Sequence, residues 1–452
     1  MPNVVLLMSD SHNPKISSVY GHPFVRTPHL ERLAASGTVY ENAYTPSPLC
    51  VPARSAFMTG RYVHEIEVFN NCKVIPAEHP SYGGVLASQG VRTVYVGAAA
   101  NLYRNPFDLG FSEMPRVKRT EPSLTTSFVR SPLPRRSLNR NYGPRAGVWQ
   151  YDIGTVDYAV RWLKETAPAL TEPWVLVVNV QPPHYPLVAL PEFWAMYDGL
   201  GDLPRYGPDH PAAQHPYAED LRYYFNTSEA TEEDIRGMRQ GYYAAVTFVD
   251  RQLGRLLDAL EQSGQLDQTV VAYTTDHGEM LGKFGLWWKH CLYEDAARIP
   301  LVVAGPGFAA GARVKTPVSL LDFQAAIFEA VGAERPADWR GEPLQHIPAA
   351  DAERVVFAEY HGNGVRSGAF LVRKGDWKLI YNMAAPHQLF NLRDDPEELE
   401  NMWEKEPDVA RELEAELRRI CDPEKVNERA HEKEREQLEV IRRLQARAEE
   451  RP

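Results

Sequence analysis

The chain has 452 residues, a formal net charge of −11, four cysteines and 44% hydrophobic residues, a composition typical of a globular protein with about two to four units and a sizeable core. No apolar run approaches the roughly 18 residues of a membrane-spanning helix, the chain begins without a basic leader, and its cysteines are widely spaced. These features predict a cytoplasmic protein with reduced thiols, not a membrane, disulfide-rich or structural-zinc protein. The acidic balance argues against nucleic acid or an anionic membrane as the main partner and, taken alone, against an anionic substrate.

Three buried strands are predicted from apolar runs over residues 3–8, 174–180 and 269–275. Polar residues follow each run, and ligands of open α/β sheets bind beyond the carboxyl ends of the strands. Candidate functional side chains are therefore expected at one edge of a sheet: Asp10 after the first run, His184 after the second, and Asp276 and His277 after the third.

A long helix is predicted between the second and third strands, because apolar residues recur at helical spacing from about residue 235 to residue 260, before a Ser-Gly stop. A further strand begins near residue 301 and ends in a turn. Strands that alternate with helices predict an α/β domain built on a mostly parallel sheet.

The pattern changes near residue 350. Short strand-like runs predict a small antiparallel sheet, with its own helix after Asp395-Pro396. We therefore expect three parts: a catalytic domain over residues 1–348, a C-terminal α+β subdomain over 349–420, and a helical tail over 421–452. The four strand-like runs are residues 355–360, 369–373, 377–381 and 388–392.

The tail is charged, nearly free of glycine and proline, and poor in apolar residues. Two interpretations are open: a solvated, frayed helix, or an arm that packs on a neighbouring subunit and makes a homo-oligomer.

The most specific motif is Cys50-Val-Pro-Ala-Arg54, followed by Thr59-Gly60. Cys-x-Pro-x-Arg with a later Thr-Gly resembles the signature of the formylglycine-dependent sulfatases of the alkaline phosphatase superfamily, and the resemblance runs from residue 3 to about residue 405. It implies an alkaline-phosphatase-like sandwich with a large, mostly parallel central sheet flanked by helices. It also implies hydrolysis of a sulfate ester, a small anionic ester substrate, and a formylglycine-generating enzyme as the partner that oxidises Cys50 to an aldehyde.

The resemblance also implies a site for one divalent cation. An anionic ester repels nucleophiles, so a metal that draws charge from its oxygens suits this chemistry. The ligands implied are Asp10, Asp276, His277 and the modified Cys50.

The position after Asp10, where the family often carries an acidic or amide ligand, is Ser11. Either the site uses fewer protein ligands, with water or His12 filling in, or Ser11 acts only by contacting the ligands. His277 in place of an amide resembles the branch of choline sulfatases and phosphonate monoester hydrolases, and imidazole shifts the expectation from Ca²⁺ toward Mn²⁺.

Four further residues match substrate-contacting or catalytic positions of the family. Arg54, one helical turn after Cys50, is expected beneath the modified side chain. Asn71 matches a substrate-contacting asparagine, although the adjacent Asn70 leaves that position uncertain by one residue. Lys289 matches the lysine that binds the ester oxygens, and His184 matches the histidine near the leaving group.

One departure from the family concerns a Gly-Lys-Trp-His segment that many sulfatases carry, because this chain has Gly97-Ala-Ala-Ala100 in its place. Ala98 and Ala100 therefore remove one cation and one proton acceptor, and the base for breakdown of the covalent intermediate cannot be assigned. Since the phosphonate branch also lacks that pair, a phosphonate monoester or phosphodiester hydrolase with the same site is the alternative activity.

Two other features have open interpretations. The basic segment over residues 116–145 is either a solvated loop or a rim that attracts anionic substrate, with Arg135 and Arg136 as the residues to reverse. Trp149, Trp287 and Trp288 pack in the core or line a pocket for the leaving group, where they could contact an ammonium.

Residues 391–416 hold eleven acidic and three basic residues. Most of the net charge therefore belongs to the C-terminal part, and the objection to an anionic substrate falls away.

Overall fold

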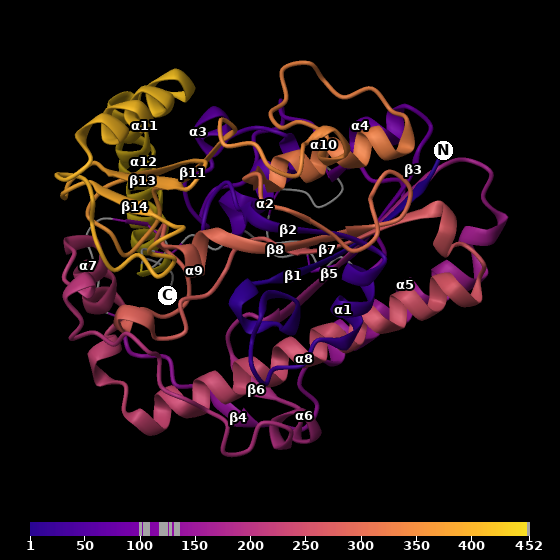
Figure 1. The fold of residues 1–452 in the computed structure, drawn as a ribbon, viewed down its shortest axis with the longest axis horizontal. Coiled ribbons are helices and arrows are strands. Elements are labelled where there is room, and N and C mark those ends of the chain that lie inside the picture. Colours follow the sequence, from indigo (N-terminus) through magenta and orange to yellow (C-terminus); the bar gives the residue numbers. More distant parts are fainter. Residues whose placement is uncertain (99–101, 103–108, 117–124, 126–128, 131–135, 450–452) are drawn as a thin grey trace.

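The computed structural model describes residues 1–98, 102, 109–116, 125, 129–130 and 136–449, and shows a large sheet between two layers of helices with a smaller sheet beside it (Figure 1). The large sheet has eight strands, and among its described pairings only β8 runs antiparallel to its neighbours. Across the sheet the strands are β10 (Val318–Ser319), β2 (Gly37–Tyr44), β8 (Arg298–Ala304), β7 (Thr269–Thr275), β1 (Asn3–Asp10), β5 (Trp174–Pro183) and β3 (Arg92–Gly97), and β9 (Ala312–Val314) pairs with β2.

Helices cover both faces of this sheet because its central strands are buried on both sides. In β1, Val5 and Leu7 point to one hydrophobic cluster, and Val4 and Leu6 point to the other. One face carries α1 (Pro28–Ala35), α5 (Gln150–Glu165) and α8 (Glu232–Gln262), and the other carries α2 (Cys50–Thr59), α4 (Tyr82–Ser88) and α10 (Leu320–Val331) (Figure 1).

The predicted strands and the long helix are present. The helix α8 begins three residues before the predicted start, because Thr231 and Asp234 form a capping box that satisfies the first backbone N–H groups. The fold class expected from the sequence, an α/β sandwich on a mostly parallel sheet, is confirmed.

The small sheet is antiparallel, as predicted, with strands β11 (Val355–Tyr360), β12 (Ala369–Lys374), β13 (Trp377–Asn382) and β14 (Gln388–Asn391) in that order. The helix expected after Asp395-Pro396 is present as α11, which spans Pro407–Ile420 and begins eleven residues beyond Pro396. The intervening chain forms turns instead: the carboxylate of Asp395 accepts the backbone N–H groups of Leu399 and Glu400, and Glu398 has a left-handed backbone.

The remaining elements complete the chain. None of the helices described is long and apolar enough to cross a membrane. The remaining α-helices are α3 (Val63–Ile66), α6 (Pro191–Ala195), α7 (Pro216–Phe225), α9 (Glu294–Ala297) and α12 (Pro423–Glu449). A further pair of strands, β4 (Tyr142–Pro144) and β6 (Leu187–Ala189), is parallel.

The tail helix α12 packs against its own chain. Arg429 forms an ion pair with Glu67, and Gln437 bonds to Asn70. The side chain of Ile441, 3% exposed, packs with Cys72 and Val129. The helix is therefore not solvated on all sides up to Ile441. Its packing on a neighbouring subunit stays a prediction.

Candidate active site

A pocket of about 590 Å³ lies where β1 and β5 end and α2 begins. Parallel strands bring their carboxyl ends to the same edge, so Asp10 and Pro183 are neighbours in the sheet. Six of the predicted site residues line this pocket, and Asp276 and His277 lie buried beside them. The six are Asp10, Cys50, Arg54, Asn71, His184 and Lys289.

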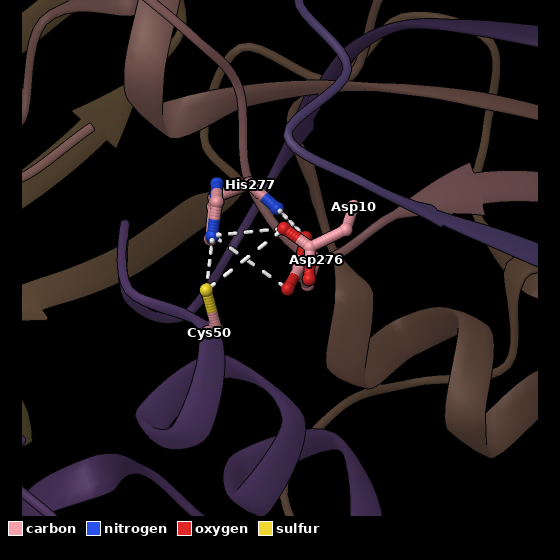
Figure 2. Close-up of side chains that lie close together, drawn as sticks. All are labelled: Asp10, Cys50, Asp276 and His277. Carbon is pink, nitrogen blue, oxygen red and sulfur yellow. Dashed lines mark hydrogen bonds and ion pairs between the residues drawn. The ribbon is translucent and has the colours of Figure 1, made fainter. Parts of the chain in front are cut away.

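Four side chains converge at one end of the pocket, with the sulfur of Cys50 projecting from the start of α2 toward the ends of β1 and β7 (Figure 2). One ligand atom from each of Asp10, Cys50, Asp276 and His277 lies within 4.8 Å of the others. The Nε2 of His277 is 3.2 Å from the sulfur, 3.8 Å from Asp10 Oδ1 and 3.6 Å from Asp276 Oδ2. Two carboxylates, an imidazole and a fourth donor at position 50 fit a divalent cation.

The imidazole of His277 is oriented to present Nε2 to this cluster. Its Nδ1 lies 3.0 Å from the carbonyl oxygen of Gly278, which can only accept a hydrogen bond, so Nδ1 carries the proton. Burial, with the nearby charge of Lys289, lowers the pKa of His277 to about 3. The ring is therefore neutral near pH 7, the form that can bind a metal.

Ser11 contacts two of the predicted ligands, Asp10 and Asp276, through hydrogen bonds. Its hydroxyl donates to Asp10 Oδ1 at 3.2 Å, and its backbone N–H donates to Asp276 Oδ1 at 3.2 Å. The backbone of Ser11 has a φ of 66°, which turns the chain sharply at the end of β1. Ser11 therefore orients both carboxylates.

His12, which one of the two interpretations offered as an additional ligand, bonds elsewhere in the structure. Its Nδ1 bonds to the hydroxyl of Tyr273, and its Nε2 faces the carbonyl oxygen of Ile16. Both ring nitrogens are therefore engaged on the far side of the backbone turn at Ser11.

Arg54 binds the two carboxylates of the cluster. Its Nε donates to Asp276 Oδ2 at 2.9 Å and its Nη2 to Asp10 Oδ2 at 3.1 Å, while Nη1 donates to Asn179 Oδ1 at 3.0 Å. Burial works against ionisation of Asp10, but His184, which is protonated at the low pH where Asp10 titrates, and Arg54 outweigh it, so the pKa of Asp10 lies below its usual range. At Asp276 burial prevails over Arg54 and raises the pKa.

The unmodified Cys50 is a poor nucleophile. Burial and the charge of Asp10 raise the pKa of its thiol to about 12. Since the thiolate is the reactive form, the residue is inert as a cysteine near pH 7.

Asn71, and not Asn70, faces the pocket. The Oδ1 of Asn71 accepts the backbone N–H of Val51 at 3.1 Å, beside Cys50. The amide of Asn70 instead exchanges hydrogen bonds of 2.7 and 3.2 Å with Gln437 of α12. Of the two adjacent asparagines that the sequence left open, Asn71 is therefore the one that lines the pocket.

Lys289 and His184 line the pocket in opposite charge states. Among the described residues, the ammonium of Lys289 makes no hydrogen bond or ion pair, although the side chain is buried. Burial alone would lower the pKa of Lys289, but Cys50 and Asp10 raise it. Burial and Lys289 lower the pKa of His184 to about 4, and its Nδ1 lies 2.6 Å from the carbonyl oxygen of Tyr185. Lys289 is thus charged and His184 neutral near pH 7.

The other sequence features divide between the pocket and the core. Trp149 stacks on Phe248 with ring centroids 4.3 Å apart, and Trp287 is buried in the core. Trp288 lines the pocket, so both of the roles considered for the tryptophans occur. Arg136 and Ala98 also line the pocket, and Arg135 and Ala100 lie outside the described residues.

Several residues of the site were missed from the sequence, among them Asn179, Phe225 and Asn363. Asn179, which holds Arg54, is the one polar residue inside the apolar run of β5, and that interruption was a usable signal. Phe225 at the end of α7 and Asn363 in the loop after β11 also line the pocket. They come from segments far apart in the sequence, so no local pattern announces them.

Comparison with known proteins identifies the family. Residues 2–333 match the sulfatase family, and residues 282–423 match the C-terminal family of N-sulphoglucosamine sulphohydrolase. A choline-sulfatase of Rhizobium meliloti (strain 1021) is 30% identical over 434 residues, which cover 89% of this chain and 82% of the relative. Arylsulfatase K of Bos taurus is 30% identical over 473 residues, which cover 97% and 85%.

Solved structures show the same fold. The phosphonate monoester hydrolase of Agrobacterium radiobacter superposes with a TM-score of 0.77 at 21% identity, covering 93% of this chain and 95% of that one. A protein in complex with its substrate D-glucosamine-2-N,6-O-disulfate gives a TM-score of 0.74 at 21% identity, covering 95% and 98%. By its match over most of the chain and its relatives at 30% identity, the chain belongs to the sulfatase family and is a sulfuric ester hydrolase.

Proposed function

We propose that this protein hydrolyses a sulfate ester to an alcohol and inorganic sulfate, with Cys50 converted to formylglycine and one divalent cation, Ca²⁺ or Mn²⁺, bound by Asp10, Asp276, His277 and residue 50. The observation that carries the proposal is the convergence of these four donors within 4.8 Å, with the carboxylates held by Arg54. When bound, the cation would withdraw charge from the ester oxygens.

The inertness of the thiol supports the modification. A buried Cys50 with a raised pKa cannot supply a nucleophile near pH 7, whereas the hydrate of an aldehyde at this position offers an oxygen nucleophile beside the cluster. The position at the first residue of α2 fixes the direction of that side chain.

The other residues of the pocket position charge around the ester. Lys289 supplies a positive charge that can bind ester oxygens, and Asn71 supplies an amide beside residue 50. His184, with Lys289 close by, is the group that stabilises the leaving oxygen, or protonates it once the negative charge of the bound ester has raised the pKa of the imidazole. Arg54 keeps Asp10 and Asp276 oriented toward the cation.

Peptide mass spectrometry tests the modification. In active protein from a host that contains a formylglycine-generating enzyme, the peptide with residue 50 should have the mass of the aldehyde. Protein from a host without that enzyme should keep the cysteine and show no turnover. An active preparation whose peptide carries only cysteine would contradict the proposal, as would a Cys50→Ala variant with undiminished turnover.

Metal removal tests the cation site. Chelation should abolish turnover and lower the thermal unfolding midpoint, because a bound cation stabilises only the folded state. Added Ca²⁺ or Mn²⁺ should restore both, and the better of the two identifies the cation. An Asp276→Asn variant should lose the metal-dependent shift in midpoint. A midpoint that neither chelation nor added metal changes would contradict the site.

A phosphonate monoester or phosphodiester hydrolase is the second candidate. Ala98 lines the pocket where many sulfatases carry a lysine, so one cation that favours sulfate is missing. Values of kcat/KM for matched aryl sulfate and aryl phosphonate esters separate the two activities. A higher value for the sulfate ester supports the first proposal, and the reverse supports the second.

Two further predictions concern the state of the protein in the cell. We propose a cytoplasmic location, which agrees with four cysteines that form no disulfide, and a homo-oligomer formed through α12. Cell fractionation tests the location, and light scattering tests the oligomer. The exposed Val440 and Leu444 near the end of α12 are the residues to replace.

A further inference from the structure

The wall of the pocket beyond the catalytic residues is aromatic and carries an arginine. Phe225 contacts Trp288 with ring centroids 4.8 Å apart, and Tyr185 meets the edge of Trp288 at 6.3 Å. The guanidinium carbon of Arg136 lies 6.0 Å from the centroid of Phe225. Its backbone N–H donates to the carbonyl oxygen of Tyr224 at 2.7 Å, which fixes Arg136 to the end of α7.

The charges of the pocket do not balance. Asp10, assigned to the cation, is the one carboxylate among the described residues that line it, whereas Arg54, Lys289 and Arg136 are cationic. Arg54 donates to Asp10, Asp276, Asn179 and the carbonyl of Ser9. Lys289 lies beside the nucleophile and is assigned to the sulfate ester. Arg136 forms no ion pair with any described residue, although its side chain hydrogen-bonds to Tyr224, so its positive charge is not offset and is not used by the sulfate ester.

We propose that the alcohol part of the substrate carries a second anionic group, a carboxylate or a second sulfate, which Arg136 binds while the body of the alcohol lies against Phe225 and Trp288. This inference rests on the proposed sulfate ester hydrolysis at the same pocket. A guanidinium has five N–H donors, so Arg136 can bond to Tyr224 and lie against Phe225 while two parallel donors bind a carboxylate or sulfate.

The same arrangement disfavours an alcohol that carries an ammonium. Aromatic rings alone can bind an ammonium, but here a guanidinium lies on one of those rings, and no described carboxylate other than Asp10 lines the pocket to offset it. Choline sulfate would place its ammonium beside the guanidinium of Arg136, against the same aromatic rings. The charge of Arg136 therefore selects against that substrate class.

A matched pair of esters tests the proposal. The pair consists of monosulfated methyl uronides and the corresponding methyl hexosides, which differ only in a carboxylate in place of a hydroxymethyl group, tested as sets of sulfate positional isomers. A disulfated methyl hexoside distinguishes a second sulfate from a carboxylate, and choline sulfate tests the ammonium class. We expect kcat/KM for the best doubly anionic ester to exceed that of its neutral counterpart about tenfold or more, as a charged hydrogen bond predicts.

Variants of Arg136 connect that preference to the residue. In Arg136→Met the ratio of kcat/KM between the anionic ester and its neutral counterpart should fall about tenfold or more, mainly through KM, because the contact is made in the ground state as well as the transition state. Arg136→Lys, which keeps the charge without the fork, should give an intermediate ratio. Arg140→Met is the matched control, since Arg140 lies in the same segment but does not line the pocket, and its ratio should be unchanged.

The outcomes distinguish failure of the Arg136 inference from failure of the proposed sulfatase activity. Hydrolysis of sulfate esters without preference for a second anionic group, or a ratio that Arg136→Met leaves unchanged, would overturn this inference and leave the sulfatase proposal standing. Preference for choline sulfate would also overturn it. Failure of the modified, metal-loaded enzyme to hydrolyse any sulfate ester would overturn both.

Discussion

At the scale of single residues, the site depends on how one buried arginine is satisfied. The guanidinium of Arg54 touches two carboxylates, one amide oxygen and one backbone carbonyl, and each contact fixes a neighbour. A buried cation with good partners stabilises the arrangement, whereas a lost partner leaves a donor without a hydrogen bond. The geometry of the ligand carboxylates therefore depends on Asn179, which touches no predicted ligand itself.

Replacing Asn179 by alanine tests this dependence. The change removes the acceptor of Arg54 Nη1 in a buried environment, so we expect a loss of about 1–3 kcal/mol in the free energy of unfolding. We also expect a fall in kcat/KM of about tenfold from misplaced carboxylates. Urea denaturation and steady-state kinetics measure the two effects. Asn179→Asp, which keeps an acceptor for the guanidinium, is the control and should retain more activity than the alanine variant.

At the scale of elements, α12 reaches the active site through one side-chain pair. Gln437 holds Asn70, the neighbour of Asn71, so a helix at the end of the chain supports the loop after α3. Arg429 and Glu67 attach the same helix to the same loop. The tail is thus part of the support of the pocket.

A Gln437→Ala variant measures that support. Loss of the bonds to Asn70 should cost about 0.5–1.5 kcal/mol in unfolding free energy and raise KM several-fold, because Asn71 is then less well fixed. Glu439→Ala removes an exposed partner on the same helix and serves as the control. Equal KM values for the two variants would show that α12 does not position Asn71.

A partly buried pair, His64 and Glu359, also joins α3 to β11. The Nδ1 of His64 lies 2.8 Å from Glu359 Oε1. Burial would lower the pKa of His64, but Glu359 outweighs it and raises the pKa above the ordinary value of 6.5. The folded state then binds this proton more tightly than the unfolded state. Its stabilising effect is fully present below the unfolded pKa and is lost as pH rises through the folded pKa.

The pH dependence of the unfolding free energy tests whether the His64–Glu359 pair loses its stabilising effect as pH rises. A His64→Gln variant should be destabilised relative to the wild type at about pH 6 and much less so at about pH 9. The measurement is the urea midpoint of both proteins at each pH. A difference between the two proteins that grows toward high pH would contradict the assignment.

At the scale of the whole molecule, buried charges connect the small sheet to the large domain. Lys378 of β13 donates to Glu294 of α9 at 2.9 Å and to Glu398 at 2.7 Å, and its side chain is fully buried. Asn363 of the same C-terminal part lines the pocket. The part after residue 348, predicted as a subdomain, is thus joined to the catalytic domain by polar contacts that need both halves.

A Lys378→Met variant should remove the cation that two buried carboxylates share, and Glu294 would keep only its longer contacts to Arg298 and Arg373. We expect a loss of about 3–5 kcal/mol in unfolding free energy, and a lower thermal midpoint in a single transition because the halves unfold together. Lys405→Met, which breaks an exposed pair with Glu400, is the control and should change stability by less than about 1 kcal/mol. Two separate transitions in the wild type would argue that the halves fold independently.

Much of the fold was predictable because local patterns carry it. The strands β1, β5 and β7 are apolar runs with polar ends, and the order of Asp10, Cys50 and Asp276 places them at one edge of a parallel sheet. The start of α11 was not predictable from Asp395-Pro396. There, Glu398 has a left-handed backbone and pairs with Lys378 of β13, and α11 begins only at Pro407.

The sequence by itself determined the residue types of the site and its family, because a motif of fixed spacing and strand-end carboxylates are local features. Only the tertiary structure decided which neighbour of a pair faces the pocket, as with Asn71 over Asn70, and that His12 turns away from the cation site. The tertiary structure also decided the sign of the charge that lines the pocket. A chain with a net charge of −11 lines this pocket with Arg54, Arg136 and Lys289 and with Asp10 as the one described carboxylate, because folding and not composition decides which charges come together.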